Sequence, residues 1–208
     1  MIKKIAILGS TGSIGKSTLN SISSNKTYKV EILAANKNAK KLLQQAILYK
    51  VKDVFIQDFE TYNINKIKFK KKKIRLHHDL KNINKILKKK IDYCINAISG
   101  IDGLEPTLKI IPLTKNILIS NKESIICGWH LIKKKLSLFN TNFIPIDSEH
   151  FSIWELIKFE KKHLIEKIIL TASGGPFLNI SKKKTKNVKP QKALKHPNWR
   201  MGKKISID

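Results

Sequence analysis

The stretch GSTGSIGKS, residues 9–17, follows the apolar run IKKIAIL at residues 2–8 and carries three evenly spaced glycines. The apolar run predicts a short buried strand, and apolar residues at helical spacing over about residues 13–24 predict a helix directly after the glycines. A glycine-rich loop between a strand and a helix presents backbone N–H groups at a helix N-terminus, where phosphate groups bind. The sequence therefore predicts an α/β fold that begins with a phosphate-binding loop.

The spacing of the glycines distinguishes between kinds of phosphate loop. A P-loop needs G-x-x-x-x-G-K-S/T, and Gly15-Lys16-Ser17 supplies its end, but Ser10 stands where its first glycine belongs. The strict dinucleotide fingerprint G-x-G-x-x-G is not met either, because its second glycine is replaced by Thr11. The pattern that remains, G-x-x-G-x-x-G between a strand and a helix, favours a dinucleotide pyrophosphate over an ordinary strand-to-helix turn.

The end of the second predicted strand, YKVEILAA at residues 28–35, indicates which dinucleotide the loop binds. Sites for NAD place an Asp or Glu there to bind the ribose 2′-hydroxyl. This strand is followed instead by Asn36-Lys37-Asn38 and two more lysines, with no carboxylate. The sequence therefore predicts NADPH, although lysine is so common in this chain that Lys40 and Lys41 carry little weight.

The rest of the chain predicts a Rossmann-like, doubly wound parallel sheet over residues 1–148, followed by part of an α+β domain over residues 149–208. Lysine runs between about residues 60 and 90 are typical of loops or solvated faces. Glycines and prolines after residue 173 indicate a loop-rich region. Further strands are predicted at 53–57, 91–99, 116–120, 142–147 and 167–173, and helices at 38–50, from 103, at 122–136 and from 148.

Composition limits the classes of partner. The chain has 42 Lys+Arg against 15 Asp+Glu, a formal charge of +27, but its only arginines are Arg75 and Arg200. Because nucleic-acid surfaces usually employ arginine for bidentate contacts, we attribute the charge to compositional bias and expect no nucleic-acid partner. No apolar run approaches the roughly 18 residues of a membrane span. Cys94 and Cys127 lie in apolar runs and are expected to be reduced core residues of a cytoplasmic protein.

Polar residues follow several of the predicted strands, at the sheet edge where ligands of α/β proteins gather. Asp147 and Glu149 follow one strand and could bind Mg²⁺ or Mn²⁺, or Asp147 could merely cap the next helix; their spacing alone leaves both open. Lys122 follows another strand and could hold an anionic substrate oxygen or begin a helix. Gly174 and Gly175 could form an anion-binding nest or a plain turn.

Six segments, taken together, resemble the 1-deoxy-D-xylulose 5-phosphate reductoisomerase family. They occur in the family's order and spacing over essentially all 208 residues, and three of them, containing PIDSEH, ASGGPF and HPNWRMG, are the most specific in combination. The segments are ILGSTGSIGKSTL, AISGIDGLEPTL, ILISNKESI, IPIDSEH, LTASGGPF and HPNWRMGKKISID.

The resemblance implies a role for particular residues. NADPH contacts are implied for Thr11, Gly12, Ser13, Ile14, Asn36, Lys37, Asn38, Asn121, Glu123 and Gly202, although the family commonly has glycine where Asn36 stands. Asp147 and Glu149 match two of three ligands of a divalent metal (Mg²⁺, Mn²⁺ or Co²⁺). Substrate contacts are implied for Lys122, Ser148, Glu149, Ser173, His196, Trp199 and Met201, and of these Lys122, Glu149 and His196 are implied to be catalytic.

The implied activity is the NADPH- and metal-dependent isomerisation and reduction of 1-deoxy-D-xylulose 5-phosphate, a phosphosugar, to 2-C-methyl-D-erythritol 4-phosphate in isoprenoid biosynthesis. The family is expected to form homodimers. Its third metal ligand falls beyond Asp208, and so does its C-terminal helical domain. We therefore expect the 208-residue chain to be inactive alone. A non-catalytic NADPH-binding remnant and a basic nucleic-acid-binding protein are the alternatives.

Overall fold

The computed structural model describes residues 1–80, 82–171 and 173–197, and it divides the chain into two compact units, Met1–Lys158 and Phe159–Asp208. The division falls after residue 158, ten residues beyond the expected boundary between residues 148 and 149. The reason is that helix α7 (Ser148–Ile157) contacts strand β7 (Asn142–Pro145) and belongs to unit 1. The two units are described separately below.

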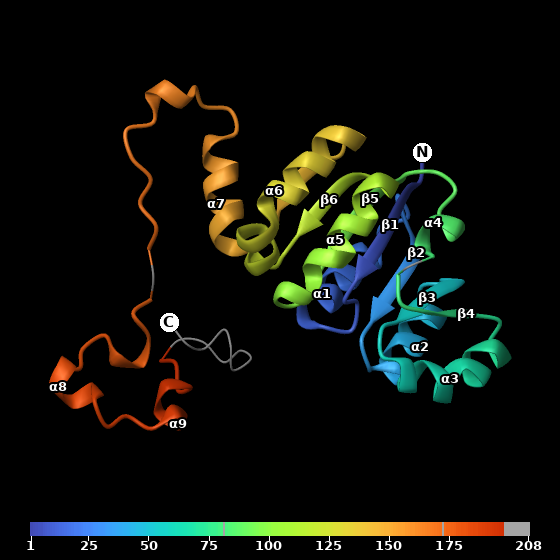
Figure 1. Ribbon diagram of the computed structural model, residues 1–208, viewed down its shortest axis with the longest axis horizontal. Coiled ribbons are helices and arrows are strands. Elements are labelled where there is room, and N and C mark those ends of the chain that lie inside the picture. Colours follow the sequence, from blue (N-terminus) through green and yellow to red (C-terminus); the bar gives the residue numbers. More distant parts are fainter. Residues whose placement is uncertain (81, 172, 198–208) are drawn as a thin grey trace. The chain divides into compact units, whose positions relative to one another are not determined.

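Unit 1 is built on a seven-stranded sheet in which every pair of neighbours is parallel, as predicted. The strand order is β4-β3-β2-β1-β5-β6-β7 (Figure 1). Successive strands are added in one direction from β1 to β4 and in the other direction from β5 to β7. The direction therefore changes between β1 and β5. The strands are β1 Lys3–Leu8, β2 Tyr28–Ala35, β3 Asp53–Ile56, β4 Arg75–His78, β5 Ile91–Asn96, β6 Thr114–Ile119 and β7 Asn142–Pro145.

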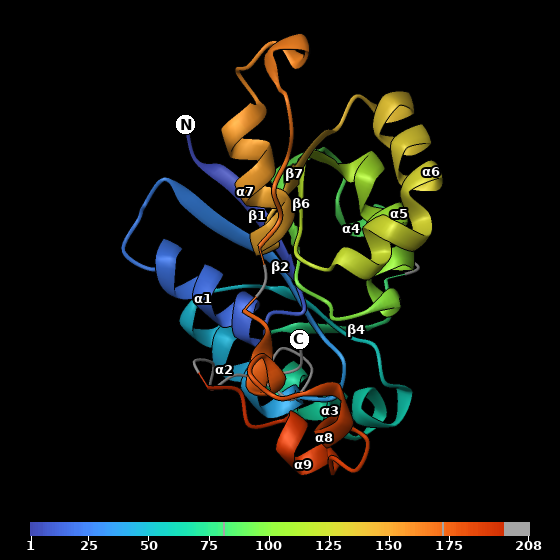
Figure 2. The ribbon, with the colours of Figure 1, turned by 90° about the vertical axis from the view of Figure 1, so that its left-hand side faces the viewer.

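Helices cover both faces of this sheet because neighbouring residues of a strand point to opposite faces. Ile7 packs in one core with Leu42 of α2, and Leu8 packs in the other with Ile132 of α6. Figure 2 shows α1 and α2 on one side of the strands and α5 and α6 on the other. The helices are α1 Ser13–Ile22, α2 Ala39–Leu48, α3 Phe59–Lys71, α4 Ile83–Ile86, α5 Leu104–Ile110, α6 Lys122–Phe139 and α7 Ser148–Ile157, with single turns at Ile101–Gly103 and Ile111–Leu113.

Some apolar residues that the sequence places in the core are exposed. Ile14 and Ile47 keep 40% and 51% of their surface accessible, although both fit the helical spacing of their neighbours. Cys94 is fully buried, and burial raises the pKa of its thiol, but Cys127 on α6 is exposed and the core prediction for it is wrong. Among the described residues, none of the helices has the length and apolar character needed to cross a lipid bilayer.

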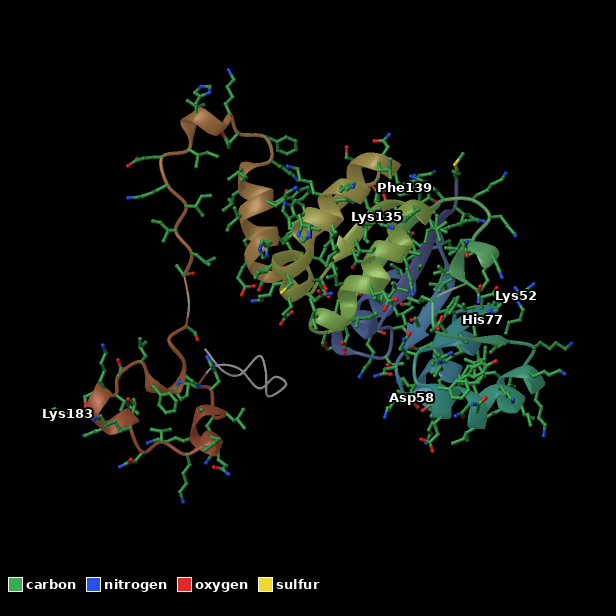
Figure 3. The ribbon with its side chains drawn as sticks, in the orientation of Figure 1. Lys52, Asp58, His77, Lys135, Phe139 and Lys183 are labelled. Atoms are coloured by element: carbon green, nitrogen blue, oxygen red, sulfur yellow. The ribbon has the colours of Figure 1, made fainter. Side chains whose placement is uncertain are left out.

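The lysine-rich segment between residues 60 and 90, predicted as loops or solvated faces, contains helix α3 and edge strand β4. Phe69 is the only buried residue of α3, and the lysines of this helix are all exposed. Strand β4 pairs with β3, and Arg75 adds to this pairing by donating to both oxygens of Asp53 at 2.7 and 2.5 Å. His77, labelled in Figure 3, lies 2.9 Å from the same carboxylate. Burial would raise the pKa of Asp53, but these hydrogen bonds outweigh it and lower the pKa.

Unit 2 contains short helical segments, and the strand predicted at residues 167–173 is not formed by those of its residues that the structure describes. Ile168, Ile169 and Leu170 are each more than half exposed. A strand needs a hydrogen-bonded neighbour, and the described part of unit 2 provides none. The segments are η3 Lys162–Leu164, η4 Gly175–Phe177, α8 Lys182–Thr185 and α9 Pro190–Ala193.

Candidate functional site

The predicted cofactor and metal residues of unit 1 all follow the carboxyl ends of strands. Thr11 to Ile14 follow β1, Asn36 to Asn38 follow β2, Asn121 to Glu123 follow β6, and Asp147 to Glu149 follow β7. In an all-parallel sheet these ends lie along one edge. The β1 loop also lies where the strand order changes direction, which is the ligand-binding position of doubly wound folds. The sheet thus brings together segments that are up to 138 residues apart in the chain.

Two of the three loop glycines are required by packing, and the third is not. Gly9 has a φ of +81°, and a Cβ there would lie 2.6 Å from the carbonyl oxygen of Ala97. A Cβ on Gly15 would lie 2.5 Å from the carbonyl oxygen of Gly9. Gly12 has a φ of −73°, and a Cβ there would meet only the Gly9 oxygen, at 3.4 Å. Gly12 is exposed, so the space that a side chain would fill faces solvent and is available to a ligand.

Helix α1, which begins directly after Gly12, has an open N-terminus. No side chain caps it, and its first turn contains no acid. Of the helices of eight or more residues in the described ranges, α2, α3, α6 and α7 are all capped by an Asn or Asp side chain. The exposed Ser13 and Ile14 and the half-buried Thr11 surround this end. Uncapped N–H groups with the positive end of the helix dipole fit a pyrophosphate.

The segment after β2 is exposed and cationic. Asn38 caps α2, its Oδ1 accepting from the Lys41 N–H at 3.0 Å. Lys37 lies 3.5 Å from Asp58, which follows β3 and itself caps α3. Asn36 keeps a φ outside the left-handed region, so it occupies this position without backbone strain. Asp58 is a nearby carboxylate that the sequence analysis did not consider, but its hydrogen bonds to Thr61 already engage it.

Asn121, at the end of β6, has one amide atom engaged and one available. Its Oδ1 accepts from the Ser124 N–H at 3.1 Å and caps α6. Its Nδ2 is buried and has no partner within the described chain. A Cβ on Gly103 would lie 2.5 Å from this nitrogen, so glycine is needed beside it. A buried N–H donor without a partner is costly, which fits a site that a cofactor acceptor completes.

Asp147, at the end of β7, both caps a helix and retains a free oxygen. Its Oδ1 accepts from the His150 N–H at 3.1 Å and lies 2.7 Å from His150 Nδ1. Because a carboxylate only accepts, Nδ1 carries the proton. Oδ2 is buried and has no partner within the described chain. The two readings that the sequence left open, helix cap and metal ligand, are therefore compatible in one residue.

Glu149 is held by neighbours from two elements. Lys122 Nζ donates to Oε1 at 2.6 Å, and Ser148 Oγ donates to Oε2 at 2.7 Å. These hydrogen bonds lower the pKa of Glu149 to about 2, Lys122 making the largest contribution and Ser148 the next. Glu149 is thus ionised at neutral pH, as a metal ligand must be.

The carboxylates of Asp147 and Glu149 fit a divalent cation in charge and donor type, and the orphaned Oδ2 is a ready ligand atom. They form only part of a site, because no group of three or more His, Cys, Asp or Glu residues capable of holding a metal occurs in the described ranges.

In unit 2 the structure brings together Ser173 and His196, which are 23 residues apart. Ser173 Oγ lies 2.7 Å from His196 Nε2, and it accepts from the Gly175 N–H at 3.3 Å. His196 is buried, and Gly174 and Gly175 both have positive φ. The remaining predicted residues of this region, Trp199, Met201 and Gly202, lie outside the described residues.

Comparison with known proteins covers both units. The family model described as 1-deoxy-D-xylulose 5-phosphate reductoisomerase matches residues 5–128, and the model of its C-terminal domain matches residues 143–208. The chain belongs to the 1-deoxy-D-xylulose 5-phosphate reductoisomerase family. It is 54% identical over 210 residues to the reductoisomerase of Pelagibacter ubique and 44% identical over 209 residues to that of Wolbachia pipientis from Culex pipiens.

Solved structures of reductoisomerases match as well. One from Zymomonas mobilis, in complex with NADPH, is 32% identical with a TM-score of 0.85 over 93% of this chain and 52% of its own. Another, in complex with NADPH, fosmidomycin and magnesium, is 32% identical with a TM-score of 0.84 over 99% of this chain and 53% of its own. The two curated relatives are covered over 54% and 53% of their length, and this chain over 100%. The chain thus spans about half the length of its reductoisomerase relatives.

Two sets of buried polar contacts, one at the glycine loop and one at the end of β5, were not found from the sequence. Ser10 Oγ donates to Gln45 Oε1 at 2.8 Å, and Gln45 Nε2 donates to the Ser10 carbonyl oxygen at 2.8 Å. Asn96, the last residue of β5, donates to the Gly103 carbonyl oxygen at 2.8 Å and to Thr107 Oγ1 at 2.6 Å. The sequence signal for these contacts was a polar residue within an apolar segment: Gln45 in α2 and Asn96 at the end of β5.

Gln45→Leu is expected to destabilise unit 1 by about 1–3 kcal/mol, because it leaves buried Ser10 groups without their partner. It should also weaken NADPH binding, since Gln45 holds the loop backbone. Urea unfolding and fluorescence titration measure the two effects. Gln44→Leu, at an exposed position of the same helix, is the matched control. Equal stability of the two variants would contradict the role given to Gln45.

Proposed function

We propose that this chain supplies the NADPH-binding unit and two metal-binding carboxylates of an enzyme that isomerises and reduces 1-deoxy-D-xylulose 5-phosphate to 2-C-methyl-D-erythritol 4-phosphate. One observation carries the proposal. The uncapped N-terminus of α1 and the partnerless Oδ2 of Asp147 follow strands whose ends form the same edge of one sheet. A phosphate-binding loop and a metal-binding carboxylate on one edge suit a reaction that needs both groups.

The cofactor half of the proposal rests on the loops after β1, β2 and β6. NADPH, when bound, supplies the hydride for the reduction. The N–H groups of Ser13 and Ile14 bind its pyrophosphate at the open helix end, since the Gly12 N–H already donates to the Gly9 carbonyl oxygen. Asn36, Lys37 and Asn38 provide amide and ammonium donors for its 2′-phosphate, where an NAD site would have a carboxylate. Asn121 and Glu123 lie at the end of β6, beyond the switch point, and orient the other end of the cofactor.

Within unit 1, the substrate half rests on the loops after β6 and β7. A divalent cation, when bound, supplies a Lewis acid for the substrate's carbonyl and hydroxyl oxygens. Asp147 and Glu149 hold it, and Lys122 stabilises negative charge that develops on a substrate oxygen. Ser148, Ser173 and His196 bind the substrate, the last as a hydrogen-bonded pair with Ser173. Trp199 and Met201 are proposed as substrate contacts, and Gly202 as a further cofactor contact; all three lie outside the described residues.

Two alternatives remain as predictions to be tested. A remnant that binds NADPH without catalysis would titrate with NADPH but lack turnover in any context. A basic nucleic-acid-binding protein would bind duplex DNA even at about 0.2 M salt and would not bind NADPH. The homodimer, the cytoplasmic location and the choice among Mg²⁺, Mn²⁺ and Co²⁺ stay predictions.

A chimera tests the proposed function directly. The Pelagibacter relative matches this chain over 210 of its residues, 54% of its length, so this chain can replace that part of it. We expect the chimera to oxidise NADPH in the presence of 1-deoxy-D-xylulose 5-phosphate and Mg²⁺ or Mn²⁺. The same chimera with Asp147→Asn should lose most of this turnover while retaining NADPH binding. A folded, NADPH-binding chimera without substrate-dependent turnover would favour the remnant instead.

A further inference from the structure

The ammonium group of Lys122 occupies the position on Glu149 that the proposed function gives to a metal ion. Nζ lies 2.6 Å from Oε1, in a hydrogen-bonded ion pair that joins the start of α6 to the start of α7. The two side chains keep 47% and 40% of their surface accessible, so solvent cations can reach the pair. Lys122 is thus a tethered cation on the carboxylate of Glu149.

A divalent cation and this ammonium group compete for the same oxygen. Mg²⁺ binds carboxylate oxygens at about 2.0–2.1 Å, so an ion on Oε1 would be placed within a few ångströms of Nζ. Positive charges at such a distance repel one another strongly, even near a protein surface. The lysine stem is long and flexible, and this one is half exposed, so the side chain can swing away at little cost.

We infer that Lys122 holds the metal position on Glu149 and is released from it when a divalent cation binds. This inference rests on the proposed function. Released Lys122 remains at the end of β6, beside Asn121, where it becomes free to contact a substrate oxygen. Lys122 therefore makes its substrate contact only after the metal position is filled, which orders the assembly of the site. If the ion pair were purely structural, metal binding would not release Lys122 from Glu149.

The inference is tested by titrating the 208-residue chain with Mn²⁺. Electron paramagnetic resonance measures the concentration of free Mn²⁺ at each step. Lys122→Gln removes the competing charge, so Mn²⁺ should bind about two- to five-fold more tightly than to the wild type, a range set by the modest strength of exposed ion pairs. Lys115→Gln is the matched control. It removes the same charge from a different exposed pair, in which Lys115 lies 2.9 Å from Asp92, and should leave the affinity unchanged.

Three outcomes would overturn the inference: equal or weaker Mn²⁺ binding by Lys122→Gln, the same gain in Lys115→Gln, or no Mn²⁺ binding by any of the proteins. An NADPH titration of the same wild-type sample separates this failure from that of the proposed function. If NADPH binds but Mn²⁺ affinity does not rise in Lys122→Gln, only the inference about Lys122 fails. If NADPH does not bind, the proposed function fails.

Discussion

Gly12→Asp is expected to lower the affinity for NADPH by about 100-fold or more while leaving the fold intact. The added carboxylate would stand at the open end of α1, and at about 4 Å from a phosphate charge the repulsion is several kcal/mol near a protein surface. Gly12 has a φ of −73° and room for a Cβ, so the backbone need not move. NADPH fluorescence titration measures the loss.

The free energy of unfolding of Gly12→Asp should rise slightly, although its affinity for NADPH falls. Asp is a better N-cap than glycine by a few tenths of a kcal/mol, so Gly12→Asp should unfold at a slightly higher urea concentration than the wild type. Gly12→Asn has nearly the same shape without the charge, so the difference in NADPH affinity between the two variants isolates the effect of the charge. If Gly12→Asp binds NADPH nearly as well as Gly12→Asn, the pyrophosphate does not lie at this helix end.

Gly9→Ala is expected to destabilise unit 1 by about 3 kcal/mol or more. A side chain at its φ of +81° costs about 1–2 kcal/mol. Its Cβ would also lie 2.6 Å from the Ala97 carbonyl oxygen, which belongs to the backbone and cannot rotate aside. The loss of unfolding free energy can be measured by urea denaturation.

Gly100→Ala is the matched control for this prediction. Gly100 has a similar φ of +73°, but nothing lies within 4 Å of a Cβ built there. Its ψ of −165° places it in a backbone region that essentially only glycine adopts, so the substitution should cost only this backbone term, about 1–3 kcal/mol. Equal costs for the two substitutions would show that the loop does not pack against β5 as described.

The parts of the fold that the sequence predicts correctly are those with strong local signals. Buried parallel strands such as β1, β5 and β6 contain short apolar runs, and helices α6 and α7 begin within three residues of the ends of β6 and β7. The glycine loop is predictable because Gly9 has a positive φ and Gly15 packs against the backbone of Gly9 and Ser10, close by in the sequence. The absence of Asp or Glu at the end of β2 could also be recognised from the sequence. The prediction of NADPH depends on the type of residue there and not on its exact geometry.

The failures arise where tertiary context decides. Strand β4 is short and contains His and Arg, and its place at the sheet edge depends on the Asp53 carboxylate of a neighbouring strand. Residues 167–173 have the composition of a strand, but composition does not supply a neighbour to pair with. The Gln45–Ser10 pair and the partnerless Oδ2 of Asp147 depend on contacts that no spacing along the chain reveals.

The central claim is that the loop after β1 and the acid-free turn after β2 bind NADPH. Titrating the 208-residue chain with NADPH and, in parallel, with NADH tests it most directly. We expect saturable NADPH binding and an NADH affinity lower by about 100-fold, since one 2′-phosphate in charge-assisted hydrogen bonds contributes roughly 3 kcal/mol. Equal affinities, tighter NADH binding or no binding of either would contradict the claim.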